Sequence, residues 1–130
     1  MAEALFRKAL ADRPGFSVVS AGVAALTGRP PEPDAAEVMR GRGLDITSCR
    51  ARQCDDKLLA EADLVLVMEE SQLKWIVGNY PQTRGKVFLI GHWRAAEIVA
   101  DPFRQPRAAF ERALVQLERH VEDWLKVFNK

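Results

Sequence analysis

Hydrophobic residues recur at helical spacing near both ends of the chain. Residues 1–10 place their apolar side chains on one helical face and their charges on the other, a pattern that predicts an amphipathic helix. A second helical pattern extends over about six turns towards the other end and predicts the longest helix of the chain. Its apolar positions are Phe110, Leu114, Leu117, Val121, Trp124, Leu125 and Phe128.

Three shorter segments have the apolar patterns of strands. Residues 62–68 contain the continuous run Leu-Val-Leu-Val-Met, which is typical of a strand covered on both faces. Residues 86–90 predict a second buried strand, and residues 16–20 alternate between apolar and polar side chains. Because helical patterns separate the three segments, the sequence predicts an α/β fold with a parallel sheet flanked by helices.

Capping residues predict where the shorter helices begin. Asp34 is expected to cap a helix that extends to about Arg40, and Asp55 or Asp56 is expected to cap a short helix that ends near Glu61. These side chains accept hydrogen bonds from the free N–H groups of the first helical turn, which the helix itself leaves unpaired.

Length, composition and charge narrow the class of protein. The chain has 130 residues, of which 48% are hydrophobic, and this predicts one domain with a substantial core. The 19 Lys and Arg residues balance the 18 Asp and Glu residues, so no global charge favours nucleic acid or an anionic membrane as a partner. No apolar run is long enough to span a bilayer, and no secretory signal pattern is present, so we expect a cytoplasmic protein.

The cysteines and histidines do not form a metal-binding pattern. Cys49 and Cys54 have no further Cys or His at ligand spacing, so we expect free buried thiols without zinc or a disulfide. His92 and His120 also lack an acidic or cysteine partner at such spacing, and we expect surface roles for both.

A candidate acid follows the strand pattern at residues 86–90. Asp101 is expected in a loop at the carboxyl edge of the sheet, where open α/β sheets bind their ligands. Pro102 restricts Asp101 to extended backbone geometry. The alternative is that this Asp-Pro pair only starts a turn or caps the following helix, and the three residues alone leave both interpretations open.

Six motifs occur in an order and spacing that resemble one protein family. They are Met1-Ala-Glu-Ala-Leu-Phe, Ser20-Ala-Gly, Ala51-Arg-Gln, Asp63-Leu-Val-Leu-Val-Met-Glu, Arg84-Gly-Lys-Val and Asp101-Pro-Phe. Over residues 1–130 the chain resembles the low-molecular-weight protein tyrosine phosphatases. The stretch Gly91-His-Trp, together with Asp101-Pro-Phe-Arg, resembles the bacterial branch linked to capsule and exopolysaccharide synthesis.

The resemblance implies a three-layer α/β/α fold with a parallel sheet and a phosphoric monoester hydrolase that forms a cysteinyl-phosphate intermediate. The family uses a Cys-x5-Arg loop after its first, central strand. Here the sixth residue after Cys49 is Asp55, and the sixth after Cys54 is Ala60. We therefore expect residues 1–130 to form a single phosphatase-like domain that is truncated at its N-terminus, lacks this strand and loop, and is inactive by itself.

The resemblance also assigns roles to individual residues. Asp101 is the expected general acid and base, Phe103 is expected to form an apolar wall of the substrate pocket, and Leu26 is expected to line the same pocket. Ser20 would support the phosphate loop, although a simple hydroxyl at a strand end explains it equally well. No metal or cofactor is implied.

The expected partner is a phosphotyrosine protein, in this branch a bacterial tyrosine kinase of polysaccharide export, with no nucleic acid and no membrane. Loss of a central strand would expose strand edges. We therefore expect an ordered form either to close the sheet by bringing its two halves together or to borrow a strand from another chain in a strand-exchanged homo-oligomer. A non-catalytic binding or regulatory module is the alternative function. Arsenate reduction on a related scaffold is a third, but Cys49 and Cys54 lack the nucleophile that they would have to resolve.

Overall fold

A computed structural model describes residues 1–23 and 27–128 of the chain. The elements follow one another as α1 (Ala2–Ala9), α2 (Pro33–Arg40), α3 (Asp56–Glu61), β1 (Val65–Val67), α4 (Glu70–Asn79), the 3-10 turn η1 (Pro81–Thr83), β2 (Val87–Leu89) and α5 (Arg107–Phe128). Within the described ranges, no helix has both the length and the apolar character that crossing a membrane requires.

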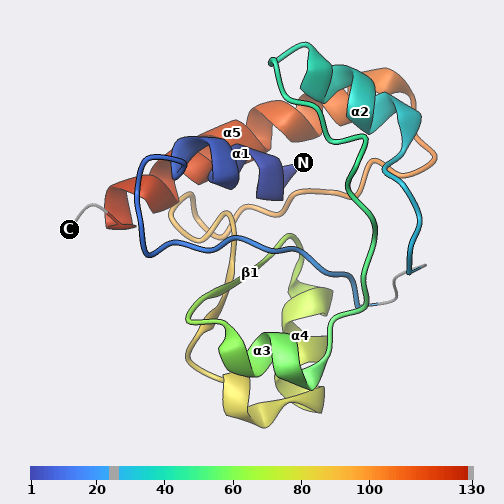
Figure 1. Cartoon of the computed structure of the whole chain (residues 1–130). Coiled ribbons are helices and arrows are strands. Elements are labelled where there is room, and N and C mark those ends of the chain that lie inside the picture. The colour runs from blue at the N-terminus through green and yellow to red at the C-terminus, as the bar shows by residue number, and fades with distance from the viewer. Residues whose placement is uncertain (24–26, 129–130) are drawn as a thin grey trace.

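A small parallel sheet separates two layers of helices (Figure 1). Strands β1 and β2 pair in parallel, with Leu66 opposite Phe88 and Val67 opposite Leu89. Side chains alternate between the two faces of a strand. Leu66 and Phe88 therefore pack towards α1 and α5, whereas Val67 and Leu89 pack towards α3 and α4. The predicted parallel sheet with helices on both faces is confirmed.

The strand predicted at residues 16–20 is wrong. This segment forms no strand, and a single bridge between Gly22 and Gln53 follows it. The Val18 carbonyl instead accepts hydrogen bonds from Nε and Nη2 of Arg7 at 3.0 and 2.8 Å. A strand exists only where another backbone pairs with it, and no described strand pairs with these residues. The described sheet consequently has two strands where the sequence predicted three.

One of the two predicted helix caps is wrong and the other is confirmed. Helix α2 begins at Pro33, after Glu32, and has no side-chain cap. Proline suits this first position because its missing N–H would have no helical acceptor there, so Asp34 lies inside the first turn and does not cap it. At α3 the Asp55 side chain accepts a hydrogen bond of 2.8 Å from the Leu58 N–H.

Helix α5 contacts both the sheet layer and α2. Phe110 and Leu114 pack into the cluster that contains α2, whereas Leu117 and Trp124 pack into the cluster that contains α1 and the sheet.

The surface role predicted for His120 is wrong, because this side chain is 0% exposed. His120 lies three residues after Leu117 and four before Trp124, a spacing that places all three on one helical face.

Both cysteines are free, as predicted. The predicted burial is confirmed for Cys54 but is wrong for Cys49, which is half-buried. Burial raises the pKa of the Cys54 thiol, and the charge of Asp55 raises it further. A reactive catalytic cysteine requires the opposite shift, because the thiolate is the nucleophile.

We predict that Leu114→Ala lowers the free energy of unfolding by about 2–5 kcal/mol, because it leaves a cavity between α5 and α2. Leu114 is 1% exposed, whereas its neighbour Val115 is 39% exposed. Val115→Ala is therefore the matched control, with an expected loss below about 1 kcal/mol. Urea unfolding of the two variants measures the difference, and equal losses would contradict the described packing of α5.

We also predict that Cys54 reacts with a disulfide reagent more slowly than Cys49 at pH 8. Single-thiol variants made by Cys49→Ser and Cys54→Ser isolate the two rates. Asp55→Asn should speed the reaction of Cys54, because it removes a negative charge that raises its pKa while asparagine still caps a helix. Faster reaction of Cys54 than of Cys49 would contradict the prediction.

The raised pKa of Cys54 also makes the stability of the fold depend on pH. Because folding raises this pKa, the protonated thiol of Cys54 stabilises the folded state at neutral pH. This contribution to the free energy of unfolding is lost as the pH rises above about 8.5.

Candidate functional site

The segment between β2 and α5 carries Asp101 and is tied to the carboxyl end of β1. The Ile90 N–H donates to the Val67 carbonyl at 2.7 Å, and the Val99 N–H donates to the Met68 carbonyl at 3.0 Å. Asp101 follows Val99 by two residues and therefore lies near the carboxyl edge of the sheet. Open α/β sheets gather their ligands at this edge.

The Asp101 side chain takes part in a tight turn. Its Oδ1 accepts a hydrogen bond of 3.0 Å from the Phe103 N–H, an arrangement typical of an Asx turn. The turn continues as the Gln105 N–H donates to the Pro102 carbonyl at 2.9 Å. The Asp-Pro pair therefore does start a turn. In the part of the chain that the structure describes, Oδ2 of Asp101 has no hydrogen-bond partner, so the turn and an acid–base role are compatible.

Phe103 presents part of its ring to solvent beside Asp101. The residue is 42% exposed, and the guanidinium carbon of Arg104 lies 5.2 Å from the ring centroid. Arg104 has a positive φ of 62°, a conformation that non-glycine residues rarely adopt. Leu26, the other predicted pocket residue, lies outside the described residues.

A separate cavity of about 450 Å³ lies beside the N-terminal end of α1. Ser20 lines it, and the Ser20 hydroxyl donates a hydrogen bond of 2.9 Å to Glu3. Arginines give the lining a positive character; they are Arg7, Arg29, Arg50 and Arg52. Asp101 and Phe103 are not among the lining residues. The structure therefore does not bring the predicted acid and this cationic cavity into one pocket.

The two cysteines do not meet the Cys-x5-Arg spacing that the resemblance implies for the nucleophile. Cys49 lines the cavity, but neither it nor Cys54 is followed six positions later by arginine. Among the residues that the structure describes, no group of Asp, Glu, His and Cys side chains could hold a metal ion.

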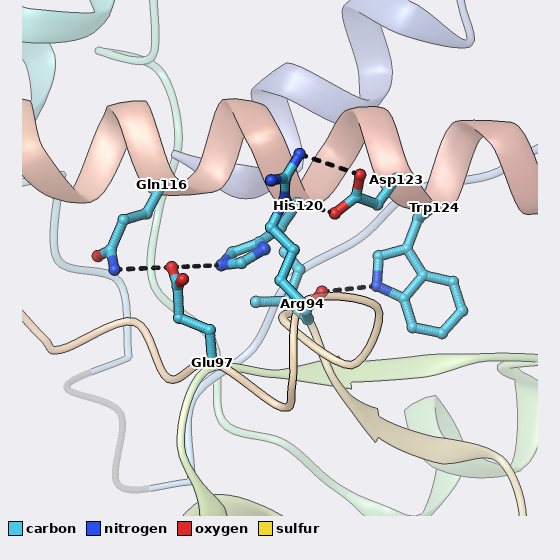
Figure 2. Close-up of polar contacts among 7 residues, drawn as sticks. Arg94, Glu97, Gln116, His120, Asp123 and Trp124 are labelled. Atoms are coloured by element: carbon cyan, nitrogen blue, oxygen red, sulfur yellow. Dashed lines mark hydrogen bonds and ion pairs between the residues drawn. The ribbon is translucent and has the colours of Figure 1, made fainter.

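Sequence reasoning missed a polar cluster between the Asp101 segment and α5 (Figure 2). Oε1 of Glu97 lies 3.1 Å from Nε2 of His120 and accepts a hydrogen bond of 2.9 Å from Gln116. The position of His120 on the apolar face of α5 was the available signal. Glu97 carried no such signal, because it lies in an irregular segment.

Comparisons with known proteins place the chain in one family. The sequence model for low molecular weight phosphotyrosine protein phosphatase matches residues 1–130. The chain is 44% identical over 125 residues to the probable low molecular weight protein-tyrosine-phosphatase EpsP of Ralstonia nicotianae, an alignment that covers 96% of this chain and 83% of EpsP.

Solved structures agree with the sequence comparison. The tyrosine phosphatase Wzb from Escherichia coli K30, solved with sulphate, superimposes with a TM-score of 0.91 and 33% identity, covering 98% of this chain and 87% of Wzb. The YwlE arginine phosphatase from Geobacillus stearothermophilus has a TM-score of 0.90 and 26% identity, covering 98% of this chain and 82% of YwlE. The resemblance predicted from the six motifs, including that to the bacterial branch, is confirmed. The chain belongs to the low molecular weight phosphotyrosine protein phosphatase family.

Proposed function

We propose that Asp101 is the general acid and base of phosphotyrosine hydrolysis and that Phe103 and Leu26 border the substrate ring. The observation that supports the role of Asp101 is the hydrogen bond between Val99 and Met68, which holds its segment at the carboxyl edge of the sheet. Asp101 would protonate the departing tyrosine oxygen and then accept a proton from the attacking water. Such acid–base help typically accelerates a reaction by about 10²–10⁴-fold.

The remaining chemistry of the family needs a thiolate and a guanidinium on one phosphate. The thiolate attacks phosphorus to give a cysteinyl-phosphate, and a bidentate arginine with loop N–H groups binds the phosphoryl oxygens. The two cysteines of these 130 residues do not meet the Cys-x5-Arg spacing, and the pKa of Cys54 is raised. The 130-residue polypeptide is therefore proposed to lack catalytic competence by itself.

A second candidate function is binding of a phosphorylated partner without hydrolysis. The cavity lined by four arginines supports this candidate, because clustered positive charge attracts and concentrates anions. The proposed partner is in both cases a phosphotyrosine protein, and within this branch a tyrosine kinase of polysaccharide export. The single-domain organisation, the cytoplasmic location and the strand-exchanged homo-oligomer stay predictions.

We predict that the 130-residue polypeptide hydrolyses para-nitrophenyl phosphate no faster than buffer, because it has no suitably placed nucleophile. Release of nitrophenolate measures the rate, and Asp101→Asn is the companion variant. Turnover by the unmodified chain that disappears in Asp101→Asn would show that a nucleophile exists within these residues. Turnover that persists in Asp101→Asn would instead contradict the role given to Asp101.

We predict that a phosphotyrosine peptide binds this chain more tightly than its unphosphorylated form. Isothermal titration calorimetry measures the affinities for the two peptides. Each titration is made at low salt and at about 0.5 M salt, roughly three times physiological ionic strength. Arg52→Ala should weaken the binding of the phosphorylated peptide, whereas Arg119→Ala, an exposed arginine on α5 outside the cavity, should not. Equal affinities for the two peptides would argue against the binding function.

A further inference from the structure

The loop from Gly91 to Glu97 is closed on itself in a conformation that its own residues do not favour. Gly91 and Glu97 form an antiparallel bridge, and a Cβ added to Gly91 would collide with the Glu97 carbonyl oxygen. Ala95 and Ala96 have φ values of 55° and 58°, in the left-handed region that side chains other than glycine disfavour. Such backbone persists only where surrounding contacts stabilise it.

Helix α5 provides those contacts along one face (Figure 2). The Trp124 indole N–H donates to the Ile90 carbonyl at 2.8 Å, which holds the residue before the loop. Nε of Arg94 lies 2.7 Å from Oδ2 of Asp123, which holds the middle of the loop. At the end of the loop, Glu97 contacts the α5 residues Gln116 and His120.

The burial of His120 assigns its tautomer. The side chain is 0% exposed, and within the described residues its Nδ1 has no hydrogen-bond partner. A buried N–H without an acceptor is rarer in proteins than an under-satisfied acceptor. The proton of the neutral ring therefore belongs on Nε2, where it is donated to Glu97 across 3.1 Å. Oε1 of Glu97 thus accepts two hydrogen bonds from α5.

Glu97 is close in sequence to the candidate acid. Val99 follows it by two residues and is tied to Met68, and Asp101 follows Val99 by two more. The Glu97 side chain remains 42% exposed, so its contacts with α5 are not needed to fill the core. They restrain the chain where it turns towards Asp101.

We propose that Glu97, held by His120 in its Nε2–H tautomer and by Gln116, is a positioning residue for the segment that carries Asp101. The proposal rests on the proposed function for the importance of Asp101, but its physical content is the order of residues 98–103. It can therefore be tested without any catalytic assay.

The test is amide hydrogen exchange by NMR on the 130-residue chain. In Glu97→Ala the exchange rates of the Val99 and Phe103 amides should rise at least about tenfold, because two hydrogen bonds to a carboxylate are lost. Glu97→Gln keeps a side-chain oxygen acceptor and should return both rates to within about threefold of the original chain. Glu118→Ala is the matched control, because Glu118 lies on α5 but pairs with Arg42 instead of the loop. The exchange rates of the Val99 and Phe103 amides should stay unchanged in this variant.

Long-range ¹H–¹⁵N spectra of the His120 ring give a second readout. The expected pattern is a protonated Nε2 and an unprotonated Nδ1, lost in Glu97→Ala and kept in Glu97→Gln. An Nδ1–H tautomer, or unchanged exchange at Val99 and Phe103 in Glu97→Ala, would overturn the proposal. If the exchange rates respond as expected but the chain hydrolyses para-nitrophenyl phosphate and this turnover persists in Asp101→Asn, the proposed function fails while the positioning role stands.

Discussion

The packing of the apolar face of α5 is the interaction on which the rest of this structure depends. One half of the face covers α2 through Phe110 and Leu114, and the other half covers α1 and the sheet through Leu117 and Trp124. Within the described residues, the sheet consists of two strands of three residues each. Two strands alone are marginally stable in water, so the burial of side chains against helices must supply most of the stability of this sheet.

Two buried side chains on the same face of α5, His120 and Trp124, carry polar groups that contact the segment packed against it. A buried polar group is costly without a hydrogen-bond partner. The Trp124 indole N–H donates to the Ile90 carbonyl, and Nε2 of His120 contacts Glu97. Both partners lie on the segment that leads from β2 to Asp101. The apolar packing of α5 and the conformation of this segment are therefore coupled, because one helix face serves both.

The fold alone does not select a substrate. The chain superimposes about equally well on a tyrosine phosphatase and on an arginine phosphatase, as expected where many activities share one scaffold. Substrate choice must instead come from side chains around the phosphoryl group. In this chain the residues proposed for such roles occupy two places: Asp101 with Phe103 on the segment after β2, and the arginines of the cavity beside α1.

Local patterns in the sequence determined helices α1 and α5, strands β1 and β2, the Asp55 cap and the family. Each depends on neighbours within a few residues along the chain, where helical or strand periodicity and capping chemistry operate. Only the tertiary structure decided that residues 16–20 form no strand, because pairing needs a partner from elsewhere in the chain. It also decided that His120 is buried against Glu97. That contact joins residues far apart in sequence, and no local pattern specifies which irregular segment will cover a given helix face.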